Sequence, residues 1–194
     1  MNRVIIVHRW DGTPTSDWYP SVAKTLRAKG FEVSIPKMPN TIEPEIDAWI
    51  QTLVQTVGKP DKNTYFIGHS IGCQTILRYL EGLEKNKEVG GVIFVAPWMH
   101  LDEETIREEG EENIAIAKPW IETPIEFKNV INHTKNFIAI FSDNDPFVPV
   151  SDAKIFEEKL GAKIMIFKDM GHFDSSKGVN ELPIVLKEML RFLK

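Results

Sequence analysis

Short runs of apolar residues alternate along the chain with longer stretches in which apolar residues recur every three or four positions. The short runs are rich in β-branched and aromatic residues and cover residues 4–7, 31–35, 65–67, 92–95, 137–141 and 164–167. Their length and composition predict six strands, and the more continuous runs suit strands that are buried on both faces.

The stretches between these runs have the periodicity of amphipathic helices. The clearest patterns run from Ile42 to Val57 and from Leu182 to Leu193, and weaker ones cover residues 20–29, 71–84 and 151–160. Strands that alternate with helices predict βαβ units, a mostly parallel sheet and right-handed crossovers.

The alternation stops between the fourth and fifth predicted strands, where residues 100–133 contain no strand pattern. Residues 102–112 carry seven acidic side chains and one arginine, a local charge of −6. Such a segment is a solvated helix face or mobile loop, or else a small lid over a functional site. The sequence thus predicts one domain over residues 1–194, with residues 98–133 as a short, lid-like insertion.

Length and composition narrow the class of protein. A chain of 194 residues with 42% hydrophobic and 26% charged residues is typical of one globular domain. The net charge of −5 argues against nucleic acid as a partner. The N-terminal apolar run is too short for a signal peptide, and no run approaches the ~18 residues of a membrane span. The single cysteine favours a reducing compartment, so we expect a soluble, cytoplasmic protein that binds no membrane.

The third predicted strand is followed by Gly68-His69-Ser70-Ile71-Gly72, which has the pattern G-x-S-x-G. In a sharp strand-to-helix turn, small residues two positions before and after the serine prevent backbone collisions. Ser70 is then presented at the carboxyl edge of the sheet, where the backbone N–H of Ile71 and the helix dipole can stabilise an oxyanion. We expect His69 to point away from Ser70 and to have a structural or entrance role.

A serine nucleophile needs a base, and the base needs a carboxylate to orient it. The fifth predicted strand ends near Asp143 and Asp145, and the sixth ends near His172. Since parallel strands end at one edge of the sheet, these groups should meet Ser70 there. The order serine, acid, histidine is that of α/β-hydrolases. The strand positions alone leave Asp143 and Asp145 as alternative acids.

Several further motifs accompany the pentapeptide: His8-Arg9-Trp10, Trp18-Tyr19-Pro20, Lys118-Pro119-Trp120, Asp143-Asn144-Asp145-Pro146-Phe147-Val148-Pro149 and Gly171-His172-Phe173. Together they resemble the α/β-hydrolases, and more narrowly the small serine hydrolases grouped with retinoblastoma-binding protein nine. The resemblance covers nearly the whole chain. It implies a compact α/β-hydrolase fold without a large cap, with six parallel strands in the order 2-1-3-4-5-6 and helices on both faces.

The resemblance also implies roles for individual residues. Ser70 is the nucleophile and His172 the general base, and Asp145 is the acid because it directly precedes the Pro-x-Val-Pro turn. The backbone N–H of Trp10 is the second oxyanion donor, although Arg9 stands where the family usually has glycine. The Leu-x-Cys-x-Glu motif by which the family's namesake binds the retinoblastoma protein does not occur here, so the sequence does not support that partner and leaves any protein partner unknown.

Aromatic side chains on the loops of this edge are candidates for an acyl pocket, namely Trp98, Trp120 and Phe147. They are alternatively a simple cover for the core. His100 and His133 have no neighbours at the spacing of metal ligands, so we expect no metal and no cofactor.

Two functions of different classes fit this pattern. The first is a serine hydrolase that cleaves a small carboxylic ester, thioester or amide through an acyl-enzyme. The second is a protein-interaction module on a hydrolase scaffold with an idle triad, because folds of this kind also host proteins that are not enzymes. The complete set of triad residues favours the enzyme.

Overall fold

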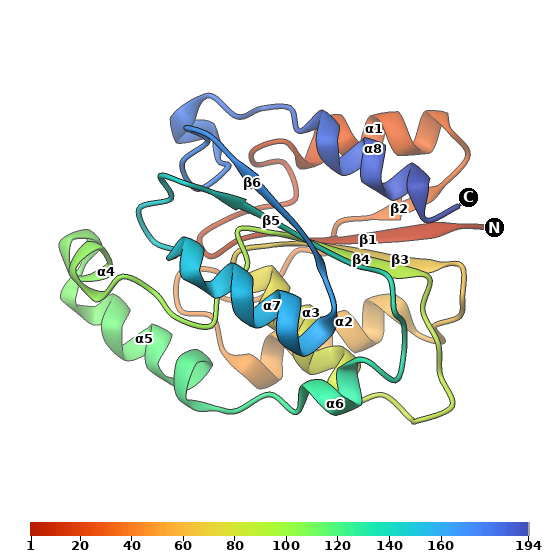
Figure 1. The fold of residues 1–194 in the computed structure, drawn as a ribbon, viewed down its shortest axis with the longest axis horizontal. Helices are drawn as coiled ribbons and strands as arrows, with labels where there is room; N and C mark the ends of the chain where they lie inside the picture. The colour runs from red at the N-terminus through yellow and green to blue at the C-terminus, as the bar shows by residue number, and fades with distance from the viewer. Residues whose placement is uncertain (194) are drawn as a thin grey trace.

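Six parallel strands form one sheet in the order β2-β1-β3-β4-β5-β6 (Figure 1). The computed structural model describes residues 1–193, so Lys194, the last residue of the predicted domain, lies outside the described residues. The strands are β1 (Arg3–Val7), β2 (Glu32–Ser34), β3 (Thr64–His69), β4 (Gly91–Val95), β5 (Phe137–Ser142) and β6 (Lys163–Phe167). The predicted strands and their order are confirmed.

Helices cover both faces of the sheet (Figure 1). One face carries α1 (Tyr19–Ala28) and α8 (Pro183–Arg191), which pack against each other. The other face carries α2 (Ile46–Val57), α3 (Ile71–Glu81) and α7 (Ala153–Leu160). Among residues 1–193, no helix combines the length and the apolar character that a membrane crossing requires.

The segment between β4 and β5 forms three helices, α4 (Glu103–Glu109), α5 (Glu111–Glu122) and α6 (Phe127–Val130). The Asp102 carboxylate caps α4 by accepting a hydrogen bond of 2.9 Å from the Thr105 N–H. The acidic side chains of α4 are exposed, and within this helix only Ile106 is buried. The acidic segment is therefore a solvated helix surface, one of the two expectations, and the lid role stays a prediction.

The second helix begins later than the periodic pattern predicts. Ile42 fits the pattern but lies outside α2, with 67% of its surface exposed. Pro44 disfavours the helical conformation for Glu43, so a helix that includes Ile42 would be interrupted there. The pattern is correct from Ile46 onward.

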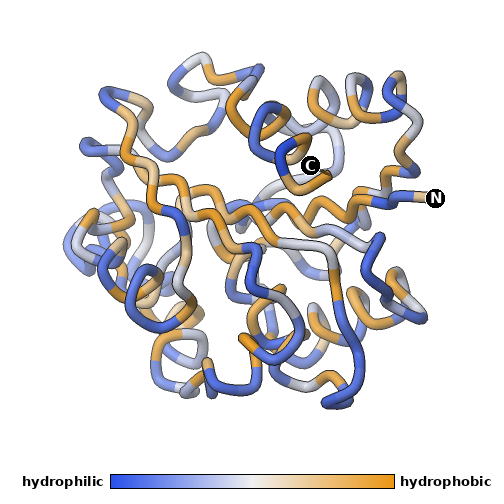
Figure 2. Tube along the Cα trace, turned by 45° about the vertical axis from the view of Figure 1, so that its right-hand side comes forward, coloured by the Kyte–Doolittle hydropathy of each residue, from blue (hydrophilic) through white to orange (hydrophobic). Residues whose placement is uncertain are grey.

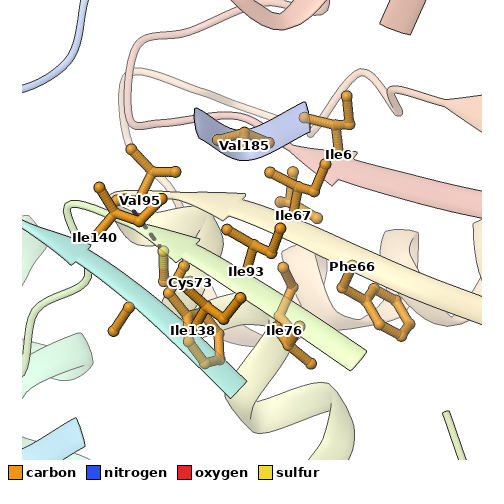
Figure 3. Packing of buried hydrophobic residues seen from close by; sticks show 14 of the residues in the cluster. Ile6, Phe66, Ile67, Cys73, Ile76, Ile93, Val95, Ile138, Ile140 and Val185 are labelled. Atoms are coloured by element: carbon orange, nitrogen blue, oxygen red, sulfur yellow. Dashed lines mark hydrogen bonds between the residues drawn. The ribbon is translucent and has the colours of Figure 1, made fainter. Parts of the chain in front are cut away.

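The core lies along the middle of the sheet. Every residue of β3, β4 and β5 is buried, and the hydrophobic colour is most continuous along the strands (Figure 2). Figure 3 shows Val185 of α8 beside Ile6 and Ile67 on one face, with Cys73 and Ile76 of α3 on the other. Burial on both faces explains the uninterrupted apolar runs of these strands.

The start of α3 lies against the end of β1. A Cβ atom built on Gly72 would lie 2.3 Å from the carbonyl oxygen of Val7, and one on Gly68 would lie 2.8 Å from the backbone nitrogen of Cys73. Both partners are backbone atoms that cannot rotate away. The two glycines of the pentapeptide therefore allow the strand-to-helix turn to close.

Replacing Gly72 with alanine should therefore destabilise the fold. We expect a loss of about 1–3 kcal/mol, as for other overpacked sites, measured as a lower midpoint of urea unfolding. Gly82, which follows α3 at φ −84°, is the control, because a Cβ there meets nothing closer than 3.6 Å. Gly82→Ala should leave stability unchanged or raise it by up to ~1 kcal/mol. Equal effects of the two changes would contradict the close approach.

Candidate active site

Ser70 lies at the turn between β3 and α3, with backbone angles φ 54° and ψ −121°. A residue with a side chain rarely adopts this region, and such strain is typical of functional sites. The backbone N–H of Ser70 donates to the Val95 carbonyl oxygen at 2.9 Å, which fixes the turn to the end of β4. Ser70 is thus held at the carboxyl edge of the sheet, as expected.

The structure brings Asp145 and His172 together. Nδ1 of His172 lies 2.8 Å from Oδ2 and 3.1 Å from Oδ1 of Asp145. The two side chains are only 8% (His172) and 1% (Asp145) exposed. Asp145 Oδ1 also accepts the N–H groups of Phe147 and Val148. A carboxylate only accepts, so Nδ1 of His172 carries the proton and donates it, while Nε2 is left for another partner.

Asp143 is engaged elsewhere. Its Oδ1 accepts a hydrogen bond of 2.9 Å from the N–H of Asp169 in the loop after β6, and the residue is exposed. Of the two aspartates that the strand positions leave open, the structure therefore pairs Asp145, and not Asp143, with His172.

Neighbouring side chains fix the loop that carries His172. Ser142 Oγ accepts the N–H of Met170 at 3.0 Å, and Asn144 Oδ1 accepts the N–H of Gly171 at 2.8 Å. The end of β5 thus supplies both the acid that binds the imidazole and the acceptors that hold the backbone beside it. Sequence reasoning identified the acid but not these acceptors.

The loop after β1 is held by its own histidine. The backbone N–H of Met38 donates to Nε2 of His8 at 3.2 Å, so Nδ1 carries the proton and donates to the Arg9 carbonyl at 2.9 Å. Burial lowers the pKa of His8, in agreement with a neutral ring. The indole of Trp10 donates to the Ile42 carbonyl at 2.8 Å. These hydrogen bonds hold the loop at His8 and at Trp10, and so they fix the course of the backbone there.

Arg9, where the family usually has glycine, forms an ion pair. Its Nε donates to Oδ2 of Asp17 at 2.8 Å, and Oδ1 of Asp17 accepts the N–H of Ser175 at 2.9 Å. Burial would raise the pKa of Asp17, but the hydrogen bonds from Arg9 and Ser175 and the Arg9 charge outweigh it and hold the pKa below its ordinary value. The arginine is therefore tied to the segment before α1.

The three candidate pocket residues have different surroundings. The ring of Phe147 meets the His172 ring edge to face, with 5.2 Å between the centroids. Trp98 and Trp120 are each 1% exposed, and the indole of Trp120 donates to the Pro44 carbonyl at 2.8 Å. Phe147 is thus placed beside the imidazole, and an acyl-pocket role for all three stays a prediction.

The insertion over residues 98–133 reaches the carboxyl edge of the sheet, where Ser70 and His172 lie. The backbone N–H of Asp102 donates to the carbonyl oxygen of Phe147 at 2.9 Å. Between α4 and α5 lies a cavity of about 200 Å³, walled mainly by aliphatic side chains that include Leu101, Ile106 and Ile121. A larger cavity of about 340 Å³ lies at the opposite edge, where β3 and β4 begin.

Sequence reasoning missed an anchor at the start of the insertion. The buried Asp152 carboxylate accepts the backbone N–H groups of Met99 (2.6 Å) and His100 (2.8 Å) and lies 2.7 Å from Nδ1 of His100. Nothing in the local sequence around Asp152 signals this contact.

Within residues 1–193, no group of three or more His, Cys, Asp or Glu residues is arranged to hold a metal ion.

The family model described as serine hydrolase matches residues 4–191, which is nearly the whole chain and includes every residue of the site. The chain belongs to the serine hydrolase family.

Individual relatives agree with this assignment. The YdeN hydrolase of Bacillus subtilis is 30% identical over 94% of this chain and 92% of its own length. Its crystal structure superposes with a TM-score of 0.90 over 100% of this chain and 99% of that chain. The serine hydrolase RBBP9 of Rattus norvegicus is 29% identical over 91% of this chain and 88% of its own. A carboxylesterase structure from the Thaumarchaeon Nitrososphaera gargenis shares the fold, with a TM-score of 0.72 at 14% identity over 99% of this chain and 89% of that chain.

The ion pair between Arg9 and Asp17 should make this serine hydrolase sensitive to acid. Because the folded state lowers the pKa of Asp17, the pair stabilises the fold above the ordinary aspartate pKa of ~3.9. That stability is lost as the pH falls through the lower, folded pKa. The free energy of unfolding, measured by denaturant titration between pH 7 and pH 3, should fall less steeply in Asp17→Asn than in the native protein. Parallel curves would contradict a pKa shift at Asp17.

Proposed function

We propose that this serine hydrolase cleaves a small carboxylic ester, thioester or amide through an acyl-enzyme intermediate. Ser70 is the nucleophile, His172 the general base and then the general acid, and Asp145 the group that orients His172. The observation that carries the proposal is the buried hydrogen bond of 2.8 Å between Asp145 and His172. It fixes the imidazole tautomer whose Nε2 can accept a proton from a serine.

The reaction begins when His172 Nε2 takes the Ser70 proton as Oγ attacks the carbonyl carbon of the substrate. The resulting oxyanion accepts hydrogen bonds from the backbone N–H groups of Trp10 and Ile71. Ile71 is the first residue of α3, so its N–H has no partner within the helix, and the helix dipole adds to the stabilisation. Asp145 stabilises the imidazolium that forms.

The tetrahedral intermediate collapses when His172 gives its proton to the leaving alcohol, thiol or amine, which departs and leaves an acyl-serine. A water molecule then loses a proton to Nε2 of His172 and attacks the acyl carbonyl. A second collapse returns the proton to Ser70 and releases the carboxylic acid. The scheme needs no cofactor, because each proton moves between His172 and a reacting oxygen, sulfur or nitrogen.

The surroundings of His172 support a small acyl substrate. Phe147 supplies an apolar surface next to the imidazole, and the insertion over residues 98–133 joins Phe147 through the N–H of Asp102. We therefore assign the insertion to the substrate side of the site, as a short lid.

A cytoplasmic location fits the lone, buried Cys73, whose thiol forms no disulfide.

The first test is the replacement of Ser70 with alanine. Turnover of a short-chain acyl ester should fall by a factor on the order of 10⁶, as for other triad serines, and labelling by a fluorophosphonate probe should disappear. Labelling that persists in Ser70→Ala would place the nucleophile elsewhere. Absence of labelling in the native protein would favour the alternative, an interaction module with an idle triad.

The two aspartates provide a matched pair of changes. Asp145→Asn should lower kcat by about 10⁴-fold, because an amide favours the wrong tautomer of His172. Asp143→Asn should have little effect, since the oxygen of asparagine can still accept the Asp169 N–H. Steady-state kinetics on both variants, with circular dichroism to verify folding, decide the assignment. The reverse order of effects would make Asp143 the acid.

A further inference from the structure

We propose that Tyr19 and His69 form a positioning relay that fixes the loop after β1 relative to the backbone of His172. The proposal rests on the proposed function, in which the first of these segments carries an oxyanion donor and the second carries the general base. Neither residue touches the reacting atoms in that scheme. The relay acts by holding the two catalytic segments in register.

The relay is a continuous chain of hydrogen bonds. The backbone N–H of Arg9 donates to the Tyr19 hydroxyl at 3.1 Å. This hydroxyl lies 2.6 Å from Nδ1 of His69, and Nε2 of His69 lies 2.7 Å from the carbonyl oxygen of His172. Residues from three distant parts of the chain are thus joined through two side chains, both fully buried.

The direction of each hydrogen bond follows from its end groups. The carbonyl oxygen of His172 can only accept, so Nε2 of His69 carries the proton. Burial places the pKa of His69 well below its usual value, so the ring is neutral and Nδ1 is an acceptor. Tyr19 therefore donates its proton to His69 and accepts the N–H of Arg9. Each polar group in the chain has a partner.

The residues next to Tyr19 contact the same two segments. The indole of Trp18 donates to the carbonyl of Phe173 at 3.0 Å. Asp17 binds Arg9 on one oxygen and the Ser175 N–H on the other. The segment 17–19 thus joins the loop after β1 to the residues that follow His172. Tyr19 also forms a hydrogen bond with His69, the residue next to Ser70, and the ring of Trp18 packs against the same histidine.

Loss of the Tyr19 hydroxyl would leave Nδ1 of His69 and the N–H of Arg9 without partners inside the protein. A buried group without a partner is unfavourable, so the loop would move to find one. The backbone N–H of Trp10 follows Arg9 directly and would move with it. A displacement of about 1 Å at a catalytic group can cost ~10²-fold in rate.

The experiment compares two tyrosine-to-phenylalanine changes. Tyr19→Phe removes the hydroxyl of the relay. Tyr79→Phe is the matched control, because Tyr79 is also buried but its hydroxyl has no hydrogen-bond partner among the described residues. We expect kcat for a short-chain acyl ester to fall by about 10- to 100-fold in Tyr19→Phe, with KM nearly unchanged. Tyr79→Phe should keep the native kcat and KM.

A double-variant cycle tests whether the two residues act as one unit. His69→Gln keeps a donor for the His172 carbonyl but loses the ring nitrogen that accepts from Tyr19. If the relay is one unit, Tyr19→Phe/His69→Gln should be about as slow as the slower single variant. Effects on kcat that multiply would mean separate roles and would overturn the relay.

Two outcomes distinguish this inference from the proposed function. Native kcat in Tyr19→Phe, in a protein whose Ser70→Ala variant is inactive, would overturn the relay and leave the function intact. Absence of acyl-ester turnover in the native protein would overturn the function and the relay together. A loss that appears only in KM would indicate a change in substrate binding and would also count against positioning.

Discussion

The sharp reversal of the backbone at Ser70 is the constraint on which the rest of the site depends. It requires a positive φ at a residue with a side chain and a helix that starts in contact with β1. Only glycine fits at position 72, where an added Cβ would meet the Val7 carbonyl oxygen. The same contact brings the first turn of α3 beside the loop that carries Trp10. The position of Ser70, the proposed nucleophile, and the spacing of the two proposed oxyanion donors therefore have one common cause.

The other loops of this edge are held mainly by side chains that accept backbone N–H groups. Ser142, Asp143 and Asn144 bind the loop after β6, and Asp145 binds its own turn as well as His172. Each such bond contributes only about 1 kcal/mol, but together they restrict the loops in a chain without a disulfide. A rigid frame of this kind keeps catalytic groups in place before a substrate arrives.

The sequence predicts the elements and the pairing of Asp145 with His172 better than it predicts the contacts that support them. Strand runs, the pentapeptide and the order of Ser70, Asp145 and His172 are local or follow from the parallel sheet, in which all strands end at one edge. The contacts of His69 join it to Tyr19 and His172, which lie 50 and 103 positions away. No local spacing encodes such pairs, so only the folded chain shows them.

The insertion between β4 and β5 is attached to α3 at its start and at the end of α5. Gln74 donates to the Trp98 carbonyl at 3.0 Å, and Arg78 donates to the carbonyls of Trp120 and Thr123, each at 2.9 Å. The two side chains are one helical turn apart and are joined by a hydrogen bond of 3.2 Å. Arg78 also lies at the carboxyl end of α5, where a cation is favoured by the helix dipole. These hydrogen bonds hold the insertion against α3, and the acidic surface of α4 lies between the residues that they hold.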